Sequence, residues 1–447
     1  MTLEETEMDS RQRVLDALNH KKPDRVPVDL GATFITGLHC SVVEALRDYY
    51  GLEKRIVKVH EPYQMLGYFD EDLKQCIGVD VEGVVPNNTI FGYPSENWKP
   101  WQTPWGQDVL VPGQFNTTSG DDGSVYMYPQ GDVLALPSGH MPASGFFFDA
   151  MVRQLPIDDE NLNAEDNLEE FKLLDNQNLS RIVRDVQAAA QTGRAVVVCT
   201  PGTALGDIAL VPAPFLKQPR GIRDIEEWYL SIAARRDYVN EIFERQVEVA
   251  VKNLQAIHDA CGKHIDVVVL CGADFGTQTS SFCSVQTFRD LWLPHYQVMT
   301  DWIHTNTPWK IMKHCCGAVS EFIDPLIEAG FDILNPVQCS AKGMEPEGLK
   351  SRFGDRITFW GGGVDTQKTL PFGTPDEVKA EVTERCKIFS KHGGFVFNAI
   401  HNIQARTPIE NVAAMVAAVH EFNGTSLKTV RRKCNERVFS SRQEDQI

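Results

Sequence analysis

The sequence predicts one domain spanning residues 1–447 with the (β/α)8 barrel fold of the α/β class, the TIM barrel. Eight short apolar segments have the length and composition of buried parallel strands. Amphipathic segments of helical length separate most of them, as a barrel requires. A doubly wound open sheet is the alternative, and it is weakened because no G-x-G-x-x-G or P-loop motif follows any strand.

The first 86 residues supply two of the eight strands. Ser10 is expected to cap the first helix, which the Lys-Lys-Pro-Asp segment ending at Asp24 closes. In chain order we expect a helix at 11–20, a strand at 25–31, helices at 41–50 and 63–75, and a strand at 78–86.

Residues 87–148 differ in character from the segments on either side. Gly, Pro, Asn and aromatic residues predominate, and Trp98, Trp101 and Trp105 lie close together in the chain. This composition predicts hairpins and loops inserted between the second and third strands. The insertion either packs on the main body or forms a lid or partner surface.

The rest of the chain alternates strands and helices down to residue 422. Strands are expected at 193–200, 264–274, 309–316, 331–338, 356–365 and 394–401. Helices are expected at 167–191, in two stretches within 222–260, and at 285–304, 318–329, 375–392 and 408–422. The tail after Gly424 is polar and basic and is expected to fray.

Charge and cysteine usage exclude several classes of protein. The formal net charge is −18, which argues against a surface that binds nucleic acid or an anionic membrane. Eleven cysteines, an odd number without regular spacing, indicate free thiols in a reducing compartment. The acidic N-terminus is unlike a secretory signal, and no segment approaches the roughly 20 apolar residues of a membrane span. We therefore expect a cytoplasmic protein.

The segment 309–317, Trp-Lys-Ile-Met-Lys-His-Cys-Cys-Gly, carries the clearest chemical signal. Alternate side chains of a strand share a face, so His314 and Cys316 should point the same way and Cys315 the opposite way. A His-x-Cys pair facing a cavity is half of a zinc site. The alternative is a buried histidine beside two structural thiols.

The other strand ends add polar residues, and the active site of a (β/α)8 barrel lies at the C-terminal ends of its strands. His314, Cys316 and His401, with Asp274 or Asp80, could complete a tetrahedral zinc site that activates a nucleophile or polarises a leaving group. His401 could instead bond an anionic substrate, and some of the carboxylates could cap helices. The full set is Asp29, Asp80, Glu82, Asp274, Gln278, His314, Cys316, Asn335, Gln338, Asp365, Gln367, Asn398 and His401.

An ordered series of segments resembles the uroporphyrinogen decarboxylase superfamily, which also contains the methyltransferases that exchange methyl groups with corrinoids. The resemblance implies a (β/α)8 barrel over most of the chain. It rests on residues 11–28, 272–278, 313–317, 329–338, 361–367 and 397–404.

Two segments help to distinguish the decarboxylase branch of the superfamily from the methyltransferase branch. The decarboxylases carry an arginine-rich segment near the start of the barrel that grips substrate carboxylates, whereas the matching residues 29–33 here contain no arginine. A polyanionic tetrapyrrole is therefore not the expected substrate. The corrinoid-linked methyltransferases use His-x-Cys and a later cysteine as zinc ligands; His314 and Cys316 match, but His401 stands where the later cysteine is expected.

The resemblance implies a methyltransferase that moves a methyl group between a small methylated compound and a corrinoid (cobalamin) cofactor on a partner protein. The compound would be a methyl ether, methylamine or methylthiol, and zinc would be held by His314, Cys316 and His401. Asp80, Asp274 and Gln278 are expected to orient the substrate, and Asn398 to line the pocket. The alternatives are a metal-independent decarboxylase or lyase acting on a smaller acid, with Asp80 and His401 as its polar pair, and a non-catalytic corrinoid-binding scaffold.

Overall fold

A curved parallel sheet forms the centre of the molecule. The computed structural model describes residues 8–168 and 171–425, so almost all of the tail predicted to fray lies outside it. Neighbouring strands of the sheet are parallel throughout. In spatial order the strands are β15 (Phe395–Val396), β14 (Thr358–Trp360), β13 (Ile333–Asn335), β12 (Lys310–His314), β11 (Val267–Cys271), β10 (Ala195–Cys199) and β3 (Val81–Val84).

The segment around Val28 closes this sheet into a barrel. Asp29 N–H donates to the carbonyl of Phe397 at 2.9 Å, and Asp80 N–H donates to the carbonyl of Val28 at 2.8 Å, so both sheet edges are bridged. The predicted strand at 25–31 shrinks to this bridge because Pro27 has no N–H and Val28 N–H donates to the Asp80 side chain. The predicted (β/α)8 barrel is confirmed.

Side chains alternate between two cores, as parallel strands in a barrel require. Val197, Val267 and Met312 belong to the core inside the barrel, whereas Val198 and Val268 face the surrounding helices. All five are almost completely buried. This continuous burial explains why the strand segments read as unbroken apolar runs.

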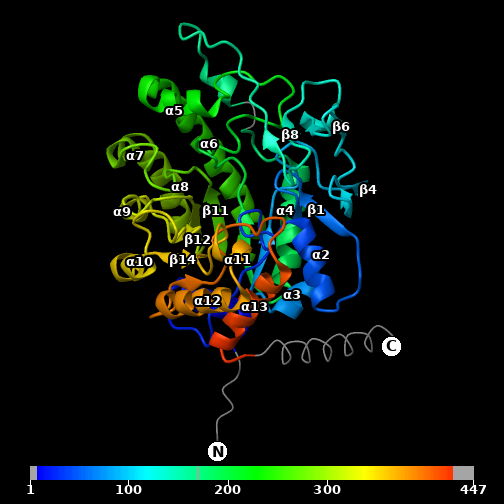
Figure 1. Cartoon of the computed structure of the whole chain (residues 1–447). Helices are drawn as coiled ribbons and strands as arrows, with labels where there is room; N and C mark the ends of the chain where they lie inside the picture. Colours follow the sequence, from blue (N-terminus) through cyan, green and yellow to red (C-terminus); the bar gives the residue numbers. More distant parts are fainter. Residues whose placement is uncertain (1–7, 169–170, 426–447) are drawn as a thin grey trace, which may run out of the picture.

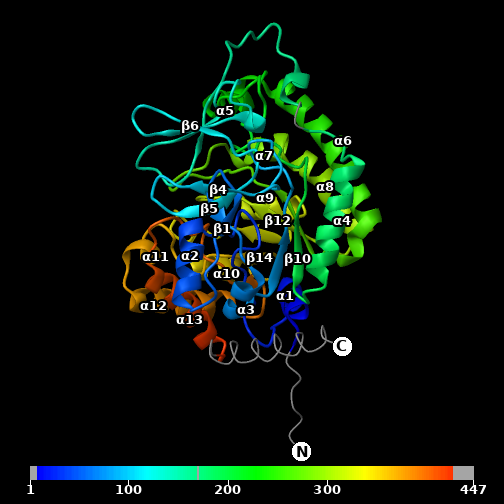
Figure 2. The same cartoon turned by 90° about the vertical axis from the view of Figure 1, so that its right-hand side faces the viewer.

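Helices surround the barrel, as Figures 1 and 2 show. Within the described residues, no helix combines the length and apolar composition needed to cross a membrane. The α-helices are α1 (Ser10–Leu18), α2 (Cys40–Tyr49), α3 (Glu71–Ile77), α4 (Asn176–Ala190), α5 (Ile225–Ala234), α6 (Arg236–Cys261), α7 (Val285–Leu291), α8 (Leu293–Asn306), α9 (Ile323–Glu328), α10 (Pro346–Phe353), α11 (Thr369–Phe372), α12 (Pro375–Phe389) and α13 (Ile409–Phe422).

Two local predictions near the N-terminus are wrong. Asp9, not Ser10, caps α1, because its side chain accepts the N–H of Gln12. The helix predicted at 63–75 begins only at Glu71, since the Glu61 carboxylate accepts the N–H groups of the two residues that follow Pro62 and fixes a turn there. This turn joins β1 (Val57–Glu61) to β2 (Leu66–Gly67), two strands that the sequence pattern did not predict.

The residues between the second and third barrel strands form hairpins in two small sheets. The first sheet joins β4 (Lys99–Gln102) and β5 (Asp108–Val111) to β1 and β2. The second is antiparallel and contains β6 (Thr117–Ser119), β7 (Val125–Met127), β8 (Gly139–Met141) and β9 (Asp149–Ala150). Figure 2 shows the second sheet at the same end of the molecule as α5.

Candidate active site

A cavity of about 530 Å³ lies at the C-terminal ends of three barrel strands. Cys199 ends β10, Val269 and Leu270 belong to β11, and His314 ends β12. β1 supplies part of another wall through Glu61. We call this space the strand-end cavity; it lies where a (β/α)8 barrel places its active site.

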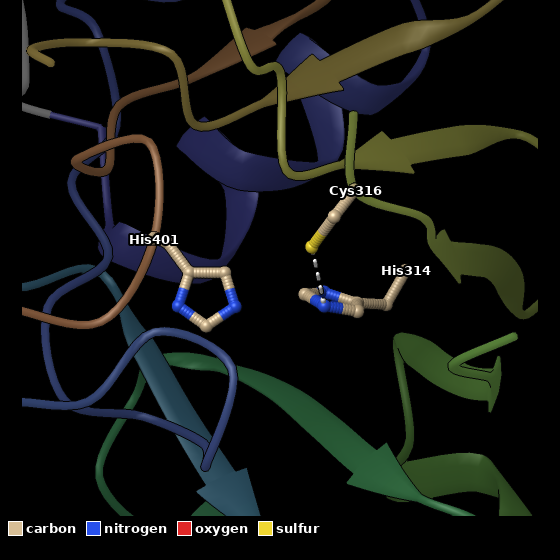
Figure 3. Close-up of side chains that lie close together, drawn as sticks. All are labelled: His314, Cys316 and His401. Carbon is tan, nitrogen blue, oxygen red and sulfur yellow. Dashed lines mark hydrogen bonds between the residues drawn. The ribbon is translucent and has the colours of Figure 1, made fainter. Parts of the chain in front are cut away.

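Three potential metal ligands meet in this cavity. One donor atom from each of His314, Cys316 and His401 lies within 4.8 Å of the other two (Figure 3). Cys316 Sγ is 3.5 Å from His314 Nε2, and the two imidazole centroids are 5.5 Å apart. Cys315 is completely buried, and its sulfur accepts the N–H of Phe275 at 3.3 Å.

Neighbouring groups hold these ligands in place. Asn335 Nδ2 donates to the carbonyl of Trp360 at 3.0 Å, which leaves Asn335 Oδ1 to accept from His314 Nδ1 at 2.7 Å. The Nε2 lone pair of His314 therefore points toward Cys316. Asp274 Oδ1 accepts the backbone N–H of Cys316 at 2.7 Å, which fixes the turn after β12.

Burial sets the protonation of the three ligands. It lowers the pKa of both His314 and His401 to about 4, so each imidazole is neutral near pH 7 and keeps a lone pair. Burial and the negative charge of Asp274 raise the pKa of the Cys316 thiol. A bound metal cation would reverse that effect, because it stabilises the thiolate.

The donor set fits a zinc ion. A tetrahedral site with Zn–N near 2.0 Å and Zn–S near 2.3 Å places adjacent N and S ligands about 3.5 Å apart. In the structure, His314 Nε2 and Cys316 Sγ are 3.5 Å apart. No fourth His, Cys or carboxylate belongs to the cluster among the residues that the structure describes. Three protein ligands with one open position are typical of catalytic zinc.

Asp80 lies at the opposite end of the barrel from the strand-end cavity. It precedes β3 and is completely buried, and its Oδ1 accepts from Arg13 Nη1 at 2.7 Å and Arg25 Nη2 at 2.9 Å. Ser10 Oγ also donates to it at 2.7 Å. The structure therefore contradicts the prediction that Asp80 orients substrate or ligates the metal. Its carboxylate instead binds Arg13 and Arg25 at the N-terminal end of the barrel strands.

Gln278 and Asn398 do not line the cavity either. Gln278 is exposed, and its side chain accepts from Gln338 Nε2 at 2.9 Å, while Gln338 Oε1 accepts the N–H of Gly317. This chain of bonds supports the turn behind Cys316. Asn398 is buried, and its Nδ2 donates to the carbonyl of Asp29 at 2.8 Å, so it joins β15 to the first barrel segment.

Two carboxyl groups that the sequence reasoning missed line the cavity, Glu61 and Asp207. Glu61 accepts the N–H groups of Tyr63 and Gln64 at 2.9 and 2.8 Å, and Asp207 Oδ1 accepts the N–H of Ala209 at 3.0 Å. Burial raises the pKa of each carboxyl to about 7. The sequence feature that could have indicated Asp207 as a site residue is the Gly-Asp pair that follows the third barrel strand.

The second half of the chain matches the family model described as uroporphyrinogen decarboxylase (URO-D), over residues 220–422. These residues are a uroporphyrinogen decarboxylase family domain. The chain is similar to the uroporphyrinogen decarboxylase of Janthinobacterium sp. (strain Marseille), at 35% identity over 17% of this chain and 21% of that one. It is also similar to that of Pelodictyon phaeoclathratiforme, at 24% identity over 41% of this chain and 52% of that one. The chain thus spans about a fifth of the length of the first of these relatives.

A solved structure extends the likeness of fold beyond the family domain. A methyltransferase from Methanosarcina mazei superposes with a TM-score of 0.52, at 16% identity, over 93% of this chain and 99% of that one. The uroporphyrinogen decarboxylase family domain contains His314, Cys316 and His401, whereas Glu61 and Asp207 precede it. The cavity is therefore built from two parts of the chain.

Proposed function

We propose that the protein is a zinc-dependent methyltransferase that moves a methyl group between a small methylated compound and a corrinoid carried by a partner protein. The observation that carries the proposal is the convergence of one donor atom each from His314, Cys316 and His401 within 4.8 Å, with a His314 to Cys316 separation that suits zinc. The open fourth position leaves room for the substrate heteroatom. The small compound would be a methyl ether, methylamine or methylthiol.

The dimensions and charge of the cavity support a small substrate without negative charge. Its volume of about 530 Å³ lies in the ordinary range for small-molecule sites, about 300–1,000 Å³. No lysine or arginine is among the described residues that line it. Uroporphyrinogen decarboxylation and decarboxylation of a smaller acid are disfavoured for the same reason, since a carboxylate substrate would find no fixed cation there.

Each group would have a separate task. Zinc would act as a Lewis acid on the heteroatom that carries or receives the methyl group, and the corrinoid would supply the methyl-transfer chemistry. Asn335 keeps His314 in the tautomer that presents Nε2, and Asp274 holds the Cys316 backbone. Asp274 also lines the cavity, where it would contact substrate.

Metal content tests the proposal directly. We expect about one zinc per chain in protein purified without added metal, and loss of zinc in both Cys316→Ser and His401→Ala. Cys199→Ser and His60→Ala are matched controls, because both residues line the cavity outside the ligand cluster and should keep zinc. Elemental analysis and circular dichroism on the same samples separate metal loss from unfolding.

The other outcomes are equally informative. Zinc lost only in Cys316→Ser would keep the metal site and assign His401 to substrate binding. Absence of zinc, even when it is offered under reducing conditions, would contradict the mechanism and favour the metal-independent decarboxylase. With zinc bound, methyl transfer from candidate compounds to added reduced cobalamin, followed by the corrinoid absorbance, tests the reaction; binding without turnover would indicate a scaffold.

A further inference from the structure

The fixed charges that line the strand-end cavity are all negative. Glu61, Asp207 and Asp274 line it, whereas no lysine or arginine does among the described residues. His60, the cavity histidine outside the ligand cluster, does not compensate, because burial lowers its pKa to about 4. The cavity is therefore electronegative above about pH 7, where Glu61 and Asp207 are ionised, in a chain whose net charge is −18.

The structure holds two of these carboxylates in defined positions. Two backbone N–H groups orient Glu61, and one orients Asp207 through Oδ1. Asp207 Oδ2 packs against Gly272, where an added Cβ would lie 2.3 Å from that oxygen. Gly272 also lines the cavity. The Asp207 carboxylate fits in this wall only because residue 272 has no side chain to occupy the same space.

Lys313, whose Nζ donates to the carbonyls of Ala273 and His314, acts on the charge of Asp207 but not on that of Glu61. A zinc ion would leave these two charges incompletely balanced. Its two positive charges match the Cys316 thiolate and the Asp274 carboxylate that accepts the Cys316 N–H. Glu61 and Asp207 do not belong to the ligand cluster. Their charge in a partly enclosed cavity is costly unless a further cation offsets it.

The walls between the charges are largely aromatic and aliphatic. Phe34, Tyr63, Phe171 and Phe215 line the cavity together with Ile35, and other apolar residues complete the surface. Aromatic faces attract cations, and they suit methylated ammonium groups, whose charge is spread over methyl surfaces. A compact metal ion would instead require oxygen ligands gathered at one point.

We propose that the strand-end cavity binds a methylated ammonium compound, with Glu61 and Asp207 as its counter-charges and the aromatic side chains as its walls. The inference rests on the proposed function, because it specifies the small methylated substrate as a cationic amine. It excludes neutral methyl ethers and neutral methylthiols as preferred substrates.

Binding calorimetry without any corrinoid tests this inference. Choline and its uncharged isostere 3,3-dimethylbutan-1-ol have the same shape and differ in charge. We expect the full-length, zinc-loaded protein at about pH 8 to bind choline at least about tenfold more tightly than the isostere. Equal affinities, or tighter binding of the isostere, would overturn the proposal.

Single substitutions identify the counter-charges. Asp207→Asn and Glu61→Gln should each weaken choline binding about tenfold and leave binding of the isostere unchanged. Asp301→Asn, which removes an exposed carboxylate from α8, is the matched control and should bind choline as the wild type does. If both cavity variants bind choline normally while remaining folded, the assignment is wrong. Choline binding without methyl transfer would refute the proposed function alone, whereas methyl transfer from a neutral ether without choline binding would refute this inference alone.

Discussion

The partly buried carboxyl of Asp207 makes a pH-dependent contribution to the stability of the fold, which one substitution removes. Its pKa rises from the ordinary 3.8 to about 7 in the folded protein, chiefly through burial. The raised value means that the folded state holds a proton which the unfolded chain releases above about pH 4. The contribution of Asp207 to the free energy of unfolding is therefore fully present below pH 4 and is lost as the pH rises through 7. Asp207→Asn replaces the carboxyl by a neutral amide of the same shape, whose oxygen still accepts the N–H of Ala209.

The expected magnitude follows from the width of the pH window. Each pKa unit corresponds to about 1.4 kcal/mol, so the interval from about pH 5.5 to the folded pKa near 7 is worth roughly 2 kcal/mol. Unfolding entropy is about 2.1 cal/mol/K per residue, which for 447 residues gives about 0.9 kcal/mol/K. The advantage of Asp207→Asn over the wild type should thus grow by about 2 °C in Tm between pH 5.5 and pH 8.5.

Scanning calorimetry on the full chain, with a chelator present to remove metal, measures this difference. Asp301→Asn removes a carboxylate from an exposed position of α8 and should show no change of this kind. A gain in Tm that is equal at both pH values would attribute the effect to packing instead of ionisation. No gain at all would mean that the Asp207 carboxylate is solvated, and the charge argument for the cavity would fail with it.

Two further predictions concern the metal ligands and the barrel base. Asn335→Ala should weaken zinc binding about 10–100-fold, because His314 loses the partner that fixes its tautomer; competition with a chromophoric chelator measures the change. Asp80→Asn should cost about 3–5 kcal/mol by leaving Arg13 and Arg25 without their shared buried carboxylate, while zinc content stays at the wild-type value. Loss of zinc from a folded Asp80→Asn protein would instead return that residue to the active site.

The sequence predicts those parts of the fold that depend on local pattern. Strand periodicity predicts that His314 and Cys316 share a face, and the structure brings their donor atoms to 3.5 Å, although β12 ends at His314 and Cys316 lies in the turn that follows. The same pattern does not distinguish the two ends of a short strand. The pattern predicts a strand from 78 onward, with Asp80 inside it, whereas β3 begins at Val81 and leaves Asp80 at its N-terminal end.

Contacts between distant segments limit what the sequence predicts about the site. Glu61 belongs to β1, which pairs with β2 and with β5 of the insertion and not with a barrel strand, so no barrel periodicity points to it. Asp207 lies in the long connection between β10 and α5, and its place depends on the bare backbone of Gly272, 65 residues away in the chain. Contacts of this kind can be identified only in the folded structure, where the closed barrel brings distant segments together.

The turn that Glu61 fixes explains its backbone contacts, but not why Glu61 and Asp207 both face one cavity as carboxyl groups. Neither forms a salt bridge among the described residues, and burial raises the pKa of both, so as carboxylates they destabilise the folded state near neutral pH. At position 207 a neutral amide of the same shape would fill the same space at lower cost, because only Oδ1 of Asp207 accepts a backbone N–H. Groups that reduce stability in this way are typical of binding sites, where a ligand supplies the missing interaction. A cation in the cavity would offset the cost directly, because it lowers the pKa of both carboxyls toward their ordinary values. Residues 220–422, which match the uroporphyrinogen decarboxylase family model, carry the three proposed metal ligands, and the preceding half of the chain carries the two carboxyl groups that we propose select the substrate.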